Sequence, residues 1–108
     1  MKVTVLGTEY KVELCDSREV KNADGLCNQY AKTIKLVDPN QLFDGTETEQ
    51  IRFERFREVI IHELVHAFSK ESGTEYDDDE ALVDWIAFMF PKISKAYNTV
   101  LEELQKGR

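Results

Sequence analysis

The residues best suited to chemistry lie in the segment His62-Glu63-Leu64-Val65-His66, which contains both histidines of the chain. On an α-helix, residues four apart lie one turn above each other and about 40° apart around the axis. Two imidazoles in that arrangement can bind one ion, and Glu63 can accept a proton from a water on that ion. The pattern therefore predicts a divalent metal site with His62 and His66 as ligands and Glu63 as a general base.

Apolar residues surround this pattern on almost every side of the predicted helix: Val59, Ile60, Ile61, Leu64, Val65, Ala67 and Phe68. A helix that is apolar all round is buried, and buried polar groups need partners. A divalent cation would satisfy both imidazoles and the Glu63 carboxylate together. The alternative is a pair of core histidines with ordinary hydrogen-bond partners.

A second predicted helix carries a narrow acidic stripe, Glu80 and Asp84, which are again four residues apart. The rest of its first half is almost entirely apolar, so we expect this helix to be mostly buried as well. If the two polar stripes face each other, Glu80 is the third metal ligand. Asp84 then accepts a hydrogen bond from the outward ring nitrogen of a histidine. Two histidines and one carboxylate, with a fourth position open to water, are typical of catalytic zinc sites.

A different assignment of the two carboxylates stays open. Asp77-x-x-Glu80 is a capping pattern, so Glu80 can simply cap the second helix. In that case Asp84 is the direct metal ligand.

The pattern at residues 62–66, followed by Glu80 and Asp84, resembles the gluzincin metallopeptidases with an H-E-x-x-H motif. More narrowly, it resembles their compact single-domain members, the minigluzincins and the ImmA/IrrE-like and phage-borne proteins. The similarity covers roughly residues 29–91. It implies a zincin-like minimal core, a zinc ion (Zn2+), hydrolysis of peptide bonds, and a substrate strand lying along the edge of the sheet.

The sequence assigns few residues to substrate binding. An extended peptide could pair with a predicted strand over residues 29–37 by strand addition. Tyr76 and Tyr97 are candidates for stabilising the transition state, by side-chain type only.

The elements that must position these residues are strands followed by helices. Residues 2–6 and 9–15 are predicted to form a β-hairpin with a turn at Gly7-Thr8. A polar loop follows over residues 16–28, and residues 29–37 are predicted to form a third strand.

Two long helices are predicted for the rest of the chain. Thr46-x-x-Glu49 is a capping-box pattern that opens the first helix, which should run to about Glu71 and end at Ser72-Gly73. The second helix should start at the aspartates of residues 77–79 and continue toward Lys106, with a kink or brief break at Pro91. The predicted class is α+β, with a small antiparallel or mixed sheet of about three strands packed on both helices.

A helical stripe on the second helix has two interpretations, core packing or a partner interface near the C-terminus: Leu82, Ile86, Met89, Ile93, Tyr97, Val100 and Leu104.

Length and composition limit the remaining possibilities. The 108 residues suffice for one domain, residues 1–108, with one core. The formal net charge of −7, from 14 basic and 21 acidic residues, argues against a nucleic-acid partner. No apolar run is long enough to span a membrane, so we expect a cytoplasmic protein in which Cys15 and Cys27 are free thiols.

The sequence thus favours a zinc-dependent metallopeptidase that acts on a peptide or protein substrate. The alternative is a non-catalytic regulatory or protein-interaction module, which keeps the metal to stabilise the same fold.

Overall fold

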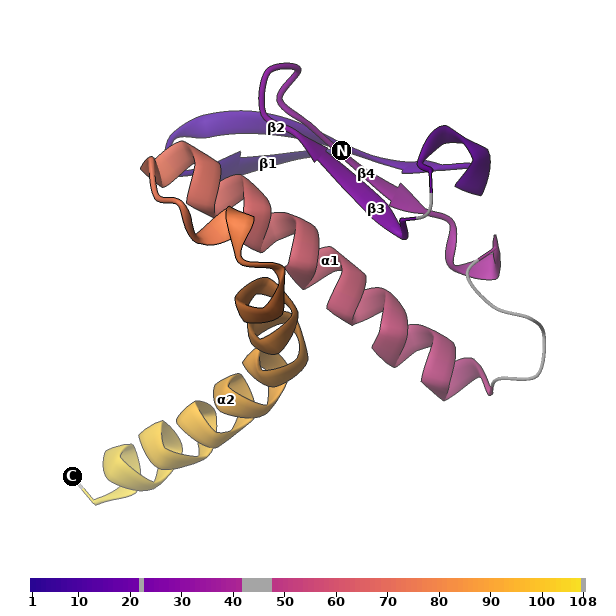
Figure 1. Cartoon of the computed structure of the whole chain (residues 1–108). Helices are drawn as coiled ribbons and strands as arrows, with labels where there is room; N and C mark the ends of the chain where they lie inside the picture. The colour runs from indigo at the N-terminus through magenta and orange to yellow at the C-terminus, as the bar shows by residue number, and fades with distance from the viewer. Residues whose placement is uncertain (22, 42–47, 108) are drawn as a thin grey trace.

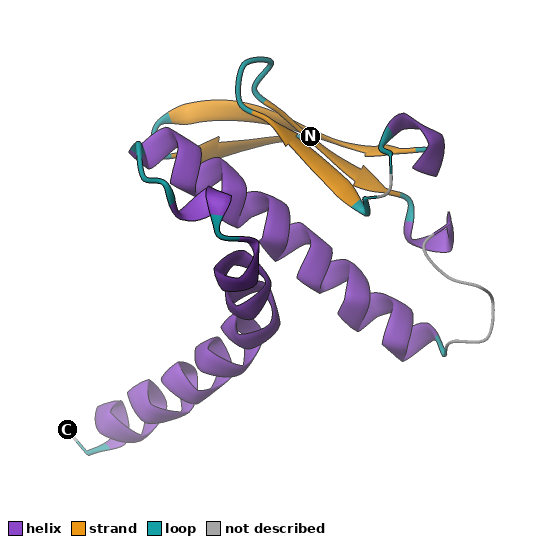
Figure 2. Ribbon diagram, viewed as in Figure 1, coloured by secondary structure: helices purple, strands orange, loops and turns teal. Residues whose placement is uncertain are grey.

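The computed structural model describes residues 1–21, 23–41 and 48–107, which form a small sheet and two long helices (Figure 1). The strands are β1 (Lys2–Val5), β2 (Thr8–Cys15), β3 (Gly25–Asn28) and β4 (Thr33–Val37). The helices are α1 (Glu49–Ser72) and α2 (Glu80–Lys106), and short 3₁₀ turns occupy Ser17–Glu19, Pro39–Gln41 and Tyr76–Asp78. The α+β class predicted from the sequence is confirmed (Figure 2).

The sheet is mixed, with the strand order β1-β2-β4-β3. The β1–β2 hairpin is confirmed, but its two-residue turn is Leu6-Gly7 rather than Gly7-Thr8, since Val5 pairs with Thr8. Both turn residues have positive φ angles, 48° and 83°, which match the twist of a tight hairpin.

The prediction for residues 16–37 was wrong in two respects. The predicted loop contains β3, and the predicted third strand begins only at Thr33, because residues 29–32 form a turn. In this turn the side chain of Asn28 accepts hydrogen bonds from the backbone N–H groups of Tyr30 and Ala31. The sheet therefore has four strands, and β4 lies inside it, parallel to β2 and antiparallel to β3.

Helix α1 lies along one face of the sheet (Figure 2). Its N-cap is Thr48, whose hydroxyl accepts a hydrogen bond from the N–H of Ile51; the expected cap, Thr46, lies outside the described residues. It ends as predicted at Gly73, which has a left-handed φ of 74°.

The main core joins sheet and helix: Val5, Tyr10, Cys27, Ile34, Leu36, Val59 and Ala67. Cys15 and Cys27 are both buried thiols.

Helix α2 crosses α1 with its first half, and its second half projects away from the sheet and from α1 (Figure 1). The helix is continuous through Pro91, so the brief break considered for this position does not occur, although the helix curves along its length (Figure 1). Neither α1 nor α2 contains a stretch long and apolar enough to span a bilayer.

The prediction that α2 is mostly buried was wrong. Val83 and Ala87 are buried, but Trp85, Phe88 and Phe90 are each more than half exposed. The physical reason is that α2 packs on α1 rather than lying on the sheet, and one neighbouring helix can cover only one of its sides.

Candidate metal centre

The two histidines lie one turn apart on the part of α1 that crosses α2. Their Nε2 atoms are 3.1 Å apart, so both rings direct the same nitrogen toward one point. The neighbouring Val59 and Ala67 are buried in the core, which fixes the rotation of this helical segment against the sheet.

Glu80, the first residue of α2, reaches both histidines. One carboxylate oxygen lies 3.4 Å from Nε2 of His62, and the other lies 3.0 Å from Nε2 of His66. The cap of α2 is a different residue, Asp79, whose side chain accepts a hydrogen bond from the N–H of Leu82. The Glu80 carboxylate is therefore directed at the imidazoles while Asp79 caps the helix.

Asp84 contacts the other side of the His62 ring. Its carboxylate oxygen lies 2.9 Å from Nδ1 of His62. A carboxylate at this position holds the ring proton on Nδ1, which leaves the Nε2 lone pair directed at the point that His66 and Glu80 also face. This geometry favours Asp84 as an orienting partner of His62 over the alternative in which it takes the place of Glu80 as a ligand.

The spacing of these donor atoms fits a metal ion. Zinc bound tetrahedrally at about 2.0–2.1 Å separates its ligand atoms by about 3.3–3.4 Å. Here the two Nε2 atoms are 3.1 Å apart, and each faces a different oxygen of the Glu80 carboxylate, at 3.4 Å for His62 and 3.0 Å for His66. With His62 neutral and its proton on Nδ1, the Nε2 lone pair would face a carboxylate oxygen of Glu80. A cation between these atoms removes that repulsion, so two imidazoles and one carboxylate suit zinc.

Glu63 lies beside this cluster and is the most buried of its acidic groups. One carboxylate oxygen is 3.9 Å from Nε2 of His62. The other oxygen is buried and has no hydrogen-bond partner among the described residues. Burial raises the pKa of Glu63 from its ordinary 4.5 to about 7, although the nearby His62 lowers it in part. A buried carboxylate without a partner is costly, and its raised pKa places it where a group can exchange a proton near neutral pH.

Gly25 allows the sheet to approach Glu63 closely. A Cβ atom at this position would lie 2.9 Å from Cγ of Glu63 and 3.0 Å from the backbone oxygen of Lys35. The first residue of β3 therefore lies directly against the proposed general base. Because Asp24-Gly25 was predicted to be part of a loop, this contact was not predicted from the sequence.

A cleft of about 550 Å³ opens beside His62, and residues of β3, α1 and α2 line it, among them Gly25, Glu63 and Phe88. Glu80 and Asp84 border the site on the solvent side, with 62% and 69% of their side-chain surfaces exposed. The site is thus accessible to a ligand.

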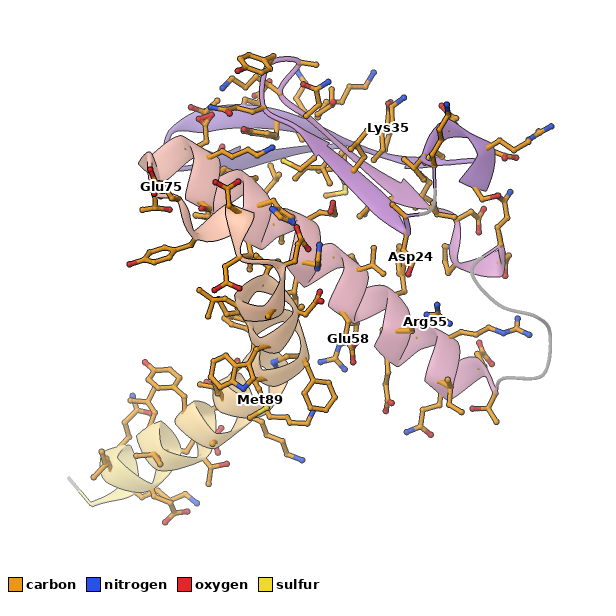
Figure 3. The ribbon with its side chains drawn as sticks, viewed as in Figure 1. Asp24, Lys35, Arg55, Glu58, Glu75 and Met89 are labelled. Atoms are coloured by element: carbon orange, nitrogen blue, oxygen red, sulfur yellow. The ribbon has the colours of Figure 1, made fainter. Side chains whose placement is uncertain are left out.

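Charged residues at the mouth of this cleft were also missed. Asp24 lies at the sheet edge, near Arg55 and Glu58 of α1 (Figure 3). Asp24 and Arg55 form an ion pair across the mouth, with 3.8 Å between their charged atoms. In the sequence Arg55 resembles any solvated helix residue, because its role depends on the position of β3.

The two tyrosines considered from the sequence lie away from this cleft. Tyr76 lines an apolar groove on the other side of α2, together with Leu82 and Phe90. Tyr97 lies on the projecting half of α2 and is 62% exposed. Neither is among the residues that line the cleft.

Comparison of the chain with protein-family models, with curated proteins and with solved structures found no match.

Proposed function

We propose that this protein is a zinc-dependent hydrolase of peptide bonds with a compact, gluzincin-like site. The observation that carries the proposal is the position of Glu80. Its carboxylate, at the start of α2, contacts both imidazoles of α1, while the buried Glu63 carboxylate lies next to them without a partner in the described chain.

In this proposal His62, His66 and Glu80 are the protein ligands. The Asp84 carboxylate orients His62 through Nδ1, 2.9 Å away. When bound, zinc would polarise a scissile carbonyl and lower the pKa of water in the site.

Glu63 is the general base of the proposed reaction. It takes a proton from the attacking water and passes that proton to the leaving amine. A pKa near the working pH suits both transfers, and the elevated pKa of Glu63, about 7, is consistent with this role. A purely structural metal site has no need for such a group.

The substrate is proposed to be an extended peptide that pairs with the outer edge of β3. The earlier expectation that it pairs with residues 29–37 was wrong, because β4 already has β2 and β3 as neighbours. The edge at β3 begins at Gly25, which contacts Glu63 and lines the cleft. A peptide that pairs with this edge of β3 would run past the proposed metal site, and its own backbone carbonyls would lie along the sheet edge. We also propose a cytoplasmic location, in keeping with two buried thiols.

The test combines metal analysis with a peptide-cleavage screen. Purified wild-type protein should bind one zinc per chain, and Glu80→Ala should lose most of this affinity. Glu75→Gln is the matched control, because Glu75 is an exposed acid at the far end of α1 (Figure 3). Glu63→Gln should keep the zinc and lose cleavage of a mixed fluorogenic peptide library by at least about 100-fold.

Two results would count against the proposal in different ways. A wild-type protein that neither contains zinc nor gains thermal stability from it would reject the metal site. Tight zinc binding without cleavage of any peptide would reject the hydrolase, and would support the metal-stabilised interaction module instead.

A further inference from the structure

The projecting half of α2 carries a continuous apolar stripe. Its members, Phe90, Ile93, Tyr97, Val100 and Leu104, are all more than half exposed, and Phe90, at the start of the stripe, also lines the apolar groove described above. At about 100° per residue, these five side chains lie within about 40° of one line along the helix. Toward the N-terminus the line continues through Leu82 and Ile86, which line the apolar groove between α1 and α2.

The neighbours of this stripe suit close contact with another helix. Ser94 and Ala96 flank it on its two sides and are small. The charged residues Lys95 and Glu102 lie on the opposite side of the helix, at about 180° and 160° from the line. The stripe thus has the form of a helix–helix interface whose partner is another apolar helix.

Two charged residues lie beside the stripe, both on the same side, at about 100–120° from the line: Lys92 and Glu103. They are near opposite ends of the exposed segment. An antiparallel helix of the same sequence would place Lys92 of each copy near Glu103 of the other. A parallel pair would leave these charges eleven residues apart, about 16 Å along the axis.

We propose that the projecting half of α2 pairs in antiparallel fashion with the same segment of a second copy of this chain. In this register Ile93 lies opposite Leu104 of the second copy, and Tyr97 lies opposite Val100 of the second copy. Two symmetric contacts between Lys92 and Glu103 then border the interface. The arrangement leaves the site at the start of α2 uncovered, so it is independent of the proposed enzymatic function.

The area available is sufficient for such a pair. The five stripe residues and Leu101 are between 37% and 67% exposed. Their whole exposed surface is on the order of 600 Å² per copy, so a dimer would bury at most about 1,200 Å², the lower limit for stable protein interfaces. We therefore expect a dimer that dissociates on dilution into the micromolar range.

The first experiment is sedimentation equilibrium of the full chain over a wide concentration range. The wild type should be a dimer at high concentration, and Val100→Glu should raise the dimer dissociation constant at least tenfold, because it places a charge in the apolar stripe. Circular dichroism of each variant reports whether α2 remains helical. A wild type that stays monomeric at all concentrations overturns the proposal and leaves the stripe to a different partner.

The second experiment tests the antiparallel register by charge reversal. Lys92→Glu and Glu103→Lys should each weaken the dimer about fivefold, because each introduces two like-charge contacts. The double variant should restore wild-type affinity. The matched control, Lys95→Glu with Glu102→Lys, reverses the charges on the outer side and should change nothing. A double variant that remains as weak as the single variants contradicts the antiparallel pairing.

Discussion

The carboxylate of Asp84 lies 2.9 Å from Nδ1 of His62, while the opposite nitrogen of the same ring faces Glu80 at 3.4 Å. One imidazole of α1 is therefore held from both sides by side chains of α2. Val59 of α1 and both Val83 and Ala87 of α2 are also buried. Metal binding and the packing of α2 on α1 are thus expected to depend on each other.

Asp84→Asn should weaken zinc binding by about 10- to 100-fold without abolishing it. The reason is that an amide no longer holds the His62 proton as firmly on Nδ1, while the three ligands remain. Competition with a chromophoric chelator measures the dissociation constant. Asp78→Asn, an exposed aspartate just before α2, is the matched control. A loss as complete as that of Glu80→Ala would instead identify Asp84 as a direct ligand.

Zinc should stabilise the folded protein, because the ligands come from two helices that converge only in the native state. At a free zinc concentration 100 times the dissociation constant, the expected gain is about 2.7 kcal/mol. Thermal unfolding with zinc and with a chelator measures this gain. His66→Ala should remove it, whereas Glu75→Gln should retain it. If zinc raises the melting temperature of His66→Ala as much as that of the wild type, the stabilising zinc binds elsewhere.

The metal-free protein should become less stable as the pH rises from about 4.5 to 7. Burial raises the pKa of Glu63 from 4.5 to about 7, so the native state binds this proton more tightly than the unfolded state does. The contribution of the protonated Glu63 carboxyl to the free energy of unfolding is complete below pH 4.5 and is lost as the pH rises through 7. The free energy of unfolding of the metal-free protein should therefore fall by about 3 kcal/mol over this pH range.

Glu63→Gln isolates this effect, because glutamine has a similar shape and does not titrate. Urea unfolding in chelator should show the variant to be more stable than the wild type at pH 8. At pH 4 the two proteins should be nearly equal. Equal stability at both pH values would mean that Glu63 is ionised at little cost in the native state.

Gly25→Ala should destabilise the protein by about 1–3 kcal/mol, because the new methyl group would meet Glu63 and the backbone of Lys35 at 2.9–3.0 Å. We also expect cleavage activity to fall, since relief of the overlap displaces Glu63. Gly107→Ala is the control, because its Cβ would meet its nearest neighbour at an ordinary 3.6 Å. Chemical denaturation of both variants gives the comparison. A Gly25→Ala protein as stable as the wild type would show that β3 is not held tightly against α1.

The parts of the fold that local chemistry determines were predictable from the sequence. Gly73 ends α1 because glycine readily adopts the left-handed conformation, and the spacing of His62 and His66 brings their rings together on any helix. The alternation of residues in β2 indicated a strand, and the hairpin followed from its pairing with β1.

The features that were not predictable from the sequence depend on contacts between distant segments. Strand β3 has only four residues and starts at Gly25, a type common in turns, so its pairing with β4 creates the strand. The inner position of β4 follows from that pairing. The exposure of Trp85 and Phe88 depends on where α2 crosses α1, which helical periodicity does not specify.

The most direct test of the central claim is a crystal structure of the zinc-loaded protein with anomalous scattering measured at the zinc edge. We predict one strong peak in contact with Nε2 of His62, Nε2 of His66 and a carboxylate oxygen of Glu80, with Asp84 on the opposite nitrogen of His62. The absence of a peak between these three side chains, or Glu80 turned away from both imidazoles, would contradict the proposed site.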